Sequence, residues 1–360
     1  MAKIDAFFKL MNEQGASDLH LISGQPPALR IRGDIERIKY KVLDNDDLRS
    51  MLYEITPDHK VKTFEETGDV DFAYEIPGLA RYRANFFMQR RGVGAVFREI
   101  PSTIMTAEQL GLPPVLSKLA GLPRGLVLVT GPTGSGKSTT LASIIDVANR
   151  NRKDHIITVE DPIEFVHQSR GCIVNHREIG LHTESFSSAL RGALREDPDI
   201  ILVGEMRDLE TISLAVEAAS TGHLVFSTLH TSSAWKTVDR VIEVFPSSEQ
   251  PLIRSTLADG LRAVISQTLF KRVDKKGRVV ALEILVANPA VRNLIREAKT
   301  HQIPSMIQTG KKFGMILLDD YIMELFQKRQ VSAEEAYAKA NEKSRFRPLL
   351  NTPPEDFTEV

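Results

Sequence analysis

The stretch Leu126-Val-Leu-Val-Thr-Gly-Pro-Thr-Gly-Ser-Gly-Lys-Ser-Thr-Thr-Leu141 decides the fold of this chain. It contains the pattern Gly-x-x-x-x-Gly-Lys-Ser, which runs from Gly131 to Ser138. A short apolar run over 126–129 predicts a buried strand before the pattern, and an amphipathic segment over 139–150 predicts a helix after it. A glycine-rich loop in this context binds phosphate, so the sequence predicts a nucleotide-binding protein.

The residue types in this loop fit that chemistry. Glycines let the backbone curl so that successive N–H groups point at phosphate oxygens, and the start of the helix adds a positive end. We expect Lys137 to reach the β- and γ-phosphates of ATP and the Ser138 hydroxyl to bind Mg²⁺. The predicted nucleotide-binding residues are Pro132, Thr133, Gly134, Ser135, Gly136, Lys137, Ser138 and Thr139.

Composition limits the class of protein. The chain has 360 residues, of which 42% are apolar and 26% charged, as in an ordinary globular protein of two or three domains. Its single cysteine, Cys172, excludes an internal disulfide and a cysteine-built zinc site. The net charge of −1 gives no global reason to expect nucleic acid as a partner. No signal peptide or membrane-length apolar run is seen, so we expect a cytoplasmic protein without direct membrane insertion.

The first 98 residues have a different pattern from the rest. Alternating apolar and polar residues predict strands over 28–34, 69–74 and 81–87, and helices are expected over 3–12 and 44–55. These elements predict a small α+β domain over 1–98. Residues 99–112, with Pro101 and Gly111, have the composition of a linker.

From residue 113 onward, predicted strands alternate with helical or loop sequence. The apolar runs lie at 126–130, 155–160, 200–204 and 224–229. This alternation predicts an α/β core over 113–288, with a parallel sheet that helices cover on both faces. Residues 289–360 are expected to be mostly helical, and the end of the chain, 344–360, to be poorly ordered.

A phosphate-binding loop needs an acid at the end of a neighbouring strand to hold Mg²⁺ through its water shell. The predicted strand 200–204 runs directly into Glu205, and Arg207 follows two residues later. We therefore predict that Glu205 supports Mg²⁺. The alternative is a solvated carboxylate at a strand end.

A second group of acids follows the predicted strand 155–160. ATP hydrolysis requires a base, or a group that orients water, near the γ-phosphate. Glu160, Asp161 and Glu164 come from this segment, where Asp161-Pro162 turns the chain. We predict that Glu164 is the base, although two of the three acids could be turn-forming surface residues.

Two histidines flank the predicted strand 224–229. His230, with Thr231 beside it, ends a strand that follows the predicted magnesium-binding strand, so it could sense the γ-phosphate. His223 begins the strand, and about 20 Å would separate the two rings, which excludes a metal pair. A histidine at a strand end is also commonly a structural residue.

Arg81 and Arg83 lie two residues apart in a predicted strand and so share one face with Asn85. Two neighbouring guanidinium groups repel each other unless an anion lies between them. They could be arginine fingers offered to the nucleotide of a neighbouring subunit. A solvated strand face explains the spacing equally well.

Five motifs occur in a characteristic order. They are Gly131-Pro-Thr-Gly-Ser-Gly-Lys-Ser-Thr, Glu160-Asp-Pro-Ile-Glu164, Ala193-Leu-Arg-Glu-Asp-Pro-Asp199, Gly204-Glu-Met-Arg-Asp208 and Thr221-Gly-His with Thr228-Leu-His-Thr231. Together they resemble the Walker A, Asp box, Walker B and His box of the secretion ATPase superfamily. Within it, nearly the whole chain is similar to the type IV pilus retraction (twitching motility) ATPases.

The resemblance implies a PAS-like N-terminal domain, a RecA-like P-loop domain and a homo-hexameric ring with nucleotide between the domains. It implies that Lys137 and Ser138 bind phosphate and Mg²⁺, and that Glu164 activates water. It also implies that Glu205 supports Mg²⁺ and that His223 and His230 form the His box. The arginines that it implies for phosphate contacts are Arg81, Arg83 and Arg207.

One further segment resembles a helix that the family links to retraction. It is Pro289-Ala-Val-Arg-Asn-Leu-Ile-Arg-Glu297, in which Val291 replaces an isoleucine. Its Arg292 and Arg296 lie four residues apart on one face, opposite Val291 and its apolar neighbours. A packed surface helix is the ordinary explanation of such a pattern.

The resemblance implies an ATP-hydrolysing motor that acts on an inner-membrane pilus platform protein from the cytoplasmic face of the membrane. An accessory retraction paralogue stays open as an alternative identity and as a partner. Pilus or type II secretion assembly ATPases usually carry a four-cysteine zinc element, which this chain lacks. A DNA-translocating motor would need a basic stripe with aromatic residues, and none is seen.

Overall fold

The computed structural model describes residues 2–31, 33–100 and 103–352. It divides into two compact units, one formed by Met1–Thr103 with Pro162–Val166 and the other by Ile104–Asp161 with His167–Val360. None of the described helices has the length and apolar character needed to cross a membrane.

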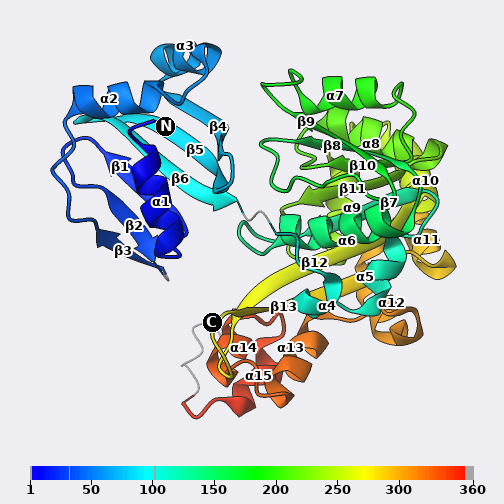
Figure 1. Ribbon diagram of the computed structural model, residues 1–360. Coiled ribbons are helices and arrows are strands. Elements are labelled where there is room, and N and C mark those ends of the chain that lie inside the picture. The colour runs from blue at the N-terminus through cyan, green and yellow to red at the C-terminus, as the bar shows by residue number, and fades with distance from the viewer. Residues whose placement is uncertain (1, 32, 101–102, 353–360) are drawn as a thin grey trace. The chain divides into compact units, whose positions relative to one another are not determined.

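The first unit is built on a six-stranded antiparallel sheet with strand order β3-β2-β1-β6-β5-β4 (Figure 1). Its elements are α1 (Asp5–Glu13), β1 (Asp18–Ile22), β2 (Ala28–Ile31), β3 (Asp34–Arg37), α2 (Asn45–Tyr53), α3 (Asp58–Thr67), β4 (Asp69–Ile76), β5 (Ala80–Gln89) and β6 (Gly92–Ile100). The predicted α+β architecture is confirmed. Strands β1, β3 and β6 and helix α3 were not predicted from the sequence.

One face of this sheet carries the hydrophobic core. Along β5 every second residue from Ala80 to Phe86 is buried, as a strand with one covered face requires. Phe8 of α1 packs against Tyr82 with ring centroids 4.3 Å apart, and buried residues of α2 and α3 join the same cluster. The residues between the buried ones on β5 therefore lie on the other face.

The second unit contains a seven-stranded sheet with strand order β13-β12-β7-β11-β10-β8-β9 (Figure 1). Its elements up to the C-terminal helices are α4 (Ala107–Leu110), α5 (Pro114–Leu119), β7 (Gly125–Thr130), α6 (Lys137–Asn151), β8 (His155–Glu160), β9 (Ile173–Glu178), α7 (Phe186–Ala193), β10 (Ile200–Val203), α8 (Leu209–Thr221), β11 (Leu224–Leu229), α9 (Ala234–Glu243), α10 (Gln250–Gly260), β12 (Leu261–Lys271) and β13 (Arg278–Val286). Every strand pair is parallel except β12 with β13.

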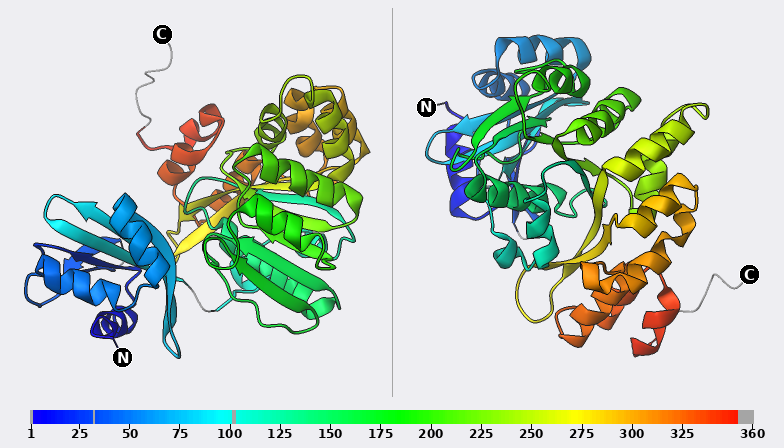
Figure 2. Two further views of the ribbon diagram at one scale, coloured as in Figure 1. Left: turned by 90° about the horizontal axis from the view of Figure 1, so that it is seen from above. Right: turned by 90° about the vertical axis from the view of Figure 1, so that its right-hand side faces the viewer.

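Both faces of this sheet are covered, as predicted. Leu126 and Leu128 of β7 join a core cluster with residues of α8, α9 and α10. Val127 and Val129 point the other way and join a cluster with residues of α5 and α6. The same helices are seen from two other directions in Figure 2. Because β7 is central and buried throughout, the loop that follows it leaves the middle of the sheet.

The C-terminal part is helical, as predicted. It comprises α11 (Pro289–Arg296), α12 (Ile303–Thr309), α13 (Leu318–Gln327), α14 (Ala333–Lys339), α15 (Lys343–Phe346) and three short 3₁₀ turns at Thr300–Gln302, Lys311–Phe313 and Arg347–Leu349. The expected disorder is wrong for the first residues of 344–360, because Phe346 is fully buried and Arg345 donates to Asp320 at 2.8 Å. Residues 353–360 lie outside the described part.

The stretch expected to be a linker, 99–112, contains regular structure. Strand β6 extends to Ile100, and α4 begins after Thr106 with a capping box in which Thr106 and Gln109 bond each other's backbone N–H groups. A Thr-x-x-Gln pattern is a recognised sequence signal for a helix start, and it was overlooked. The predicted domain limits at 98, 112 and 288 stay predictions.

Candidate functional site

The predicted phosphate loop, residues 131–138, connects β7 to α6. Gly131, Gly134 and Gly136 have φ angles of 139°, 78° and 88°, a region that favours glycine. At Gly131 space is also limiting, since a Cβ atom there would lie 2.3 Å from the backbone oxygen of Gln267. The glycine pattern is therefore required by the backbone path of the loop.

The side chain of Lys137 bridges back to the start of the loop. It is the first residue of α6, and its Nζ donates to the carbonyl oxygens of Gly131 at 2.9 Å and Pro132 at 3.2 Å. Burial lowers the pKa of Lys137, and the nearby charge of Glu205 partly opposes this shift. The ammonium group is thus held over the concave side of the loop, where phosphate oxygens would be bound.

The start of α6 is suited to an anion. The helix has 15 residues, and its first turn carries no acidic side chain. Ser138 and Thr139 are half-buried in that turn, while Pro132, Thr133 and Gly134 of the loop are exposed. Free N–H groups and the positive end of the helix dipole favour phosphate at this position.

Glu205, Arg207 and His230 meet beside this loop. Glu205 follows β10, and its Oε1 lies 2.7 Å from Nε of Arg207 and 3.0 Å from Nε2 of His230. Burial by itself raises the pKa of Glu205, but the hydrogen bond and charge of Arg207 outweigh it. The charges of His230 and Lys137 act in the same direction as Arg207, so the pKa of Glu205 lies below its ordinary value. The carboxylate is therefore ionised at neutral pH.

The register of the sheet explains why these residues come together. Val203 of β10 lies beside Ser227 of β11, and Leu229 of β11 lies beside Thr130 of β7. The carboxyl ends of parallel strands share one edge, so Glu205, His230 and the phosphate loop all leave from it. Thr228 also donates to the Gly204 carbonyl at 2.6 Å, which fixes the turn before Glu205.

This arrangement offers the ligands that Mg²⁺ prefers. The Ser138 hydroxyl and the ionised Glu205 carboxylate are oxygen donors, and Mg²⁺ bound with a nucleotide keeps several waters besides one or two protein oxygens. The residues present therefore fit the ion. No cluster of three or more histidine, cysteine, aspartate or glutamate side chains that could hold a metal alone is found among the described residues.

The three acids at and after the end of β8 are distributed over both units. Glu160 is buried, with its Oε1 4.0 Å from Nδ1 of His176. Asp161 is exposed, and its charge contributes to the raised pKa of Arg207, whose first cause is the bond to Glu205. Glu164 lies in Pro162–Val166, which groups with the first unit. The catalytic role of Glu164 stays a prediction.

His223 is not brought to the phosphate loop. Its backbone N–H and its ring Nδ1 both lie 3.1 Å from the Ala218 carbonyl oxygen at the end of α8. It precedes β11, whose first residue, Leu224, lies beside Gly125 at the amino end of β7. His223 thus occupies the opposite edge of the sheet from His230, in the structural position that the sequence analysis kept as its alternative.

Arg81 and Arg83 lie on β5, on the face of the sheet opposite the core. Arg83 forms an ion pair with Asp71 at 3.4 Å and lies directly beside Arg98 of β6. Asn85, on the same face, donates to Asp69 at 3.0 Å. The shared face is confirmed, and the role of both arginines as fingers stays a prediction.

The helix that carries Arg292 and Arg296 is packed on its apolar side. Val291 and Ile295 of α11 are fully buried, and Asn288 caps its first turn by accepting from the Val291 N–H at 2.9 Å. Nε of Arg292 donates to the Ala287 carbonyl at 2.9 Å, and Arg296 forms an ion pair with Asp259. The predicted two-sided character of the helix is confirmed.

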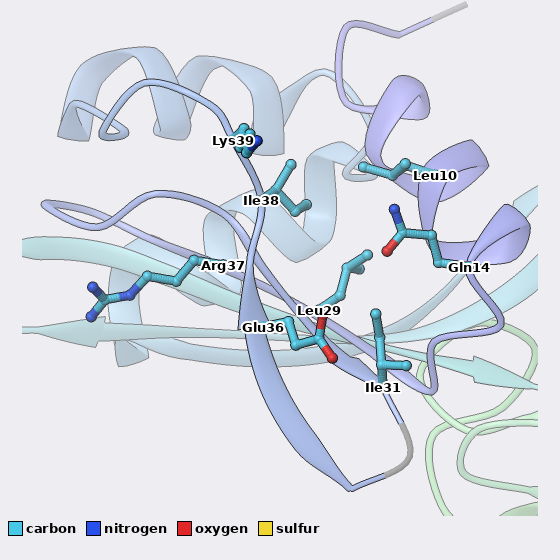
Figure 3. A pocket seen from close by; sticks show the side chains of 8 residues that line it. All are labelled: Leu10, Gln14, Leu29, Ile31, Glu36, Arg37, Ile38 and Lys39. Carbon is cyan, nitrogen blue, oxygen red and sulfur yellow. The ribbon is translucent and has the colours of Figure 1, made fainter.

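A hollow of about 360 Å³ lies elsewhere, in the first unit between α1 and the β2–β3 hairpin (Figure 3). Its lining residues are Leu10, Gln14, Leu29, Ile31, Glu36, Arg37, Ile38 and Lys39. None of them is a predicted site residue, and the mixed lining brings no nucleophile, acid pair or metal-ligand set together. This hollow therefore lacks the groups that the predicted chemistry needs.

Comparison with known proteins shows the family to which the chain belongs. Residues 94–345 match the family model described as type II/IV secretion system protein. The chain is 56% identical over 328 residues to the type IV pilus retraction ATPase PilT of Pseudomonas aeruginosa, which covers 91% of this chain and 95% of that protein. It is 52% identical over 314 residues to a twitching motility protein of Neisseria gonorrhoeae, with 87% and 84% covered.

A solved structure is also similar. A crystal structure of the pilus retraction motor PilT with bound ADP superimposes with a TM-score of 0.89 at 43% identity, covering 96% of this chain and 98% of that chain. This coverage includes residues of both units, so the fold class of each is shared with that structure.

Proposed function

This chain belongs to the type II/IV secretion system protein family, and from that premise we propose that it is an ATP-hydrolysing motor that powers type IV pilus retraction. One observation carries the proposal. Lys137 of the phosphate loop and the Glu205–Arg207–His230 cluster converge at one edge of the sheet. A loop that only binds phosphate has no need of an ionised carboxylate beside its lysine, whereas Mg²⁺-dependent hydrolysis does.

ATP is the substrate and Mg²⁺ the ion that the site would hold. The loop N–H groups and Lys137 bind the β- and γ-phosphates, and Ser138 and Glu205 hold Mg²⁺, the latter through water. A Mg²⁺ ion held there would neutralise charge on the phosphate oxygens. Glu164 accepts a proton from the attacking water, and Arg207 and His230 keep Glu205 ionised and oriented.

The active form is a homo-hexamer in which neighbours complete each other's sites. Arg81 and Arg83 of one subunit contact the nucleotide phosphates held by the next, so that hydrolysis depends on assembly. The ring acts at the cytoplasmic face of the inner membrane by binding a pilus platform protein. A paralogous retraction ATPase is a further partner, and Arg292 and Arg296 of α11 belong to the surface that transmits force.

Deletion of the gene in the source organism tests the direction of the motor. Loss of retraction should leave excess surface pili and no twitching. Complementation with the intact chain should restore twitching, and complementation with the Lys137→Ala variant should not. A deletion strain that lacks pili altogether would show instead that the chain is an assembly ATPase.

A further inference from the structure

Gln267 is a buried polar residue next to the phosphate loop that no sequence motif indicates. It lies on β12, which runs parallel to β7 with Ser266 beside Thr130. Gln267 follows Ser266 on β12, and Gly131 follows the end of β7, so Gln267 lies beside the first residue of the loop. Its side chain is 2% exposed, and 132 positions separate it in sequence from the loop residue that it contacts.

Gln267 touches the loop at three points. Its Nε2 donates to the Ser135 carbonyl oxygen at 2.6 Å. Its own carbonyl oxygen lies 2.3 Å from where a Cβ of Gly131 would be, and its Nε2 lies 3.3 Å from the corresponding position at Gly136. Gln267 therefore packs against the loop at Gly131 and again at Ser135 and Gly136.

The hydrogen bond to Ser135 has a direct consequence for phosphate binding. The Ser135 carbonyl and the Gly136 N–H belong to one planar peptide unit and point in opposite directions. Holding the carbonyl against Gln267 thus turns the Gly136 N–H away from β12, toward the concave side of the loop. Oriented N–H groups of this kind form the anion-binding surface of a phosphate loop.

The side chain also carries a cost that packing alone would not justify. Gln267 Oε1 is buried and, within residues 2–31, 33–100 and 103–352, accepts no hydrogen bond. A buried amide with one unsatisfied end is less favourable than an apolar side chain of similar volume. The hydrogen bond from Gln267 to the Ser135 carbonyl is the contact that offsets this cost.

We propose that Gln267 is a positioning residue for phosphate binding: its amide holds the Ser135 carbonyl and thereby aims the Gly136 N–H at the phosphates of the nucleotide. This inference rests on the proposed role of the phosphate loop. Gln267 itself touches no phosphate, so its loss should weaken nucleotide binding without abolishing it.

The first test is the Gln267→Leu variant, which keeps the volume and removes the donor. Its dissociation constant for Mg·ADP, measured by titration calorimetry on the full chain, should rise about tenfold, because binding must then orient the Gly136 N–H at a cost of about one hydrogen bond. KM for ATP should rise by more than kcat falls. Thr268→Val, at the next position of the same strand, is the matched control and should change neither value.

A second variant separates hydrogen bonding from packing. In Gln267→Glu the introduced carboxyl can donate to the Ser135 carbonyl only while it is protonated. The ratio of variant to intact-chain affinity for Mg·ADP should therefore be close to one at low pH and fall as pH rises through the pKa of the introduced group. A ratio that does not change with pH would overturn the proposal.

The Lys137→Ala variant distinguishes failure of the inference about Gln267 from failure of the phosphate-loop assignment. If Lys137→Ala loses Mg·ADP affinity while Gln267→Leu binds as the intact chain does, the loop assignment holds and the inference about Gln267 is wrong. If Lys137→Ala itself binds normally, the phosphate-loop assignment is wrong, and with it the basis for a role of Gln267.

Discussion

Among single residues, Glu205 is where the charges of the site converge. Its Oε1 is within 3.0 Å of nitrogen atoms of both Arg207 and His230, and the charge of Lys137 also lowers its pKa. An ionised acid in this position can hold a cation but is a weak proton acceptor. The lowered pKa of Glu205 therefore supports its proposed role in holding Mg²⁺, while Glu164 stays the proposed base.

The two acids should consequently fail in different ways. Glu164→Gln keeps the shape of the side chain but cannot accept a proton, so it should bind Mg·ATP normally and turn over about 10²–10⁴ times more slowly. Glu205→Gln should raise the Mg²⁺ concentration needed for half-maximal activity. Steady-state ATPase assays over a Mg²⁺ series measure both effects. Equal losses of nucleotide affinity in the two variants would contradict the division of roles.

His167 gives a residue-level prediction about stability. It is 4% exposed, and burial, followed by the neighbouring His176, lowers its pKa from 6.5 to about 4. The charge of Arg170 also lowers it, whereas that of Asp146 raises it. Between pH 6.5 and about 4 the unfolded chain binds a proton at His167 that the folded chain does not. The free energy of unfolding therefore decreases as pH falls through this range.

The expected size of the His167 effect is about 3 kcal/mol at the acid end of that window. Denaturant unfolding of the chain at several pH values would measure it. His167→Gln should flatten the dependence, whereas His59→Gln, at an exposed position of α3, should not. An unchanged pH slope in His167→Gln would show that another group is responsible.

At the scale of helices and strands, the elements that could be predicted are those marked by a short-range sequence pattern. The strand–loop–helix unit of β7 and α6 could be predicted because the glycine positions, the apolar run and the helix start all lie within 16 residues of quoted sequence. Strand β12 could not, since its sequence neither alternates nor stays apolar. Its place beside β7, and with it the contact of Gln267 to the loop, depends on long-range pairing.

Other elements were missed or misjudged for similar reasons. The capping box at Thr106 was a local signal that went unused, whereas the order of the chain near Phe346 depends on burial against α13 and its neighbours. The positions of Glu205 and His230 were predicted as strand ends. Their direct contact follows from the parallel register, which no single motif encodes.

Helix α8 gives a prediction at this scale. It begins directly after the Glu205–Arg207 turn, and Asp208 caps it by accepting from both the N–H and the hydroxyl of Thr211 at 2.8 Å. Asp208→Ala should lower the free energy of unfolding by about 1 kcal/mol. Asp208→Asn, which retains an acceptor, should lose less. Chemical denaturation would show the difference, and equal stability of the alanine variant would mean that the cap is not needed.

At the scale of the whole molecule, the proposed sharing of sites predicts that a single chain is inactive alone. The residues predicted to bind phosphate belong to the second unit, whereas Arg81 and Arg83 belong to the first. If a neighbouring subunit supplies these arginines, each site can respond to the state of the next one around the ring. A missing arginine finger lowers turnover by about 10³ or more.

The most direct measurement is ATPase turnover in a mixture of two defective proteins. Arg81→Ala/Arg83→Ala and Glu164→Gln should each be folded and nearly inactive. Co-assembled, they should regain activity, because some sites then pair an intact Glu164 with intact arginines from a neighbour. A mixture that co-assembles by sedimentation but never recovers turnover, or an intact chain that is fully active as a monomer, would contradict the shared-site motor.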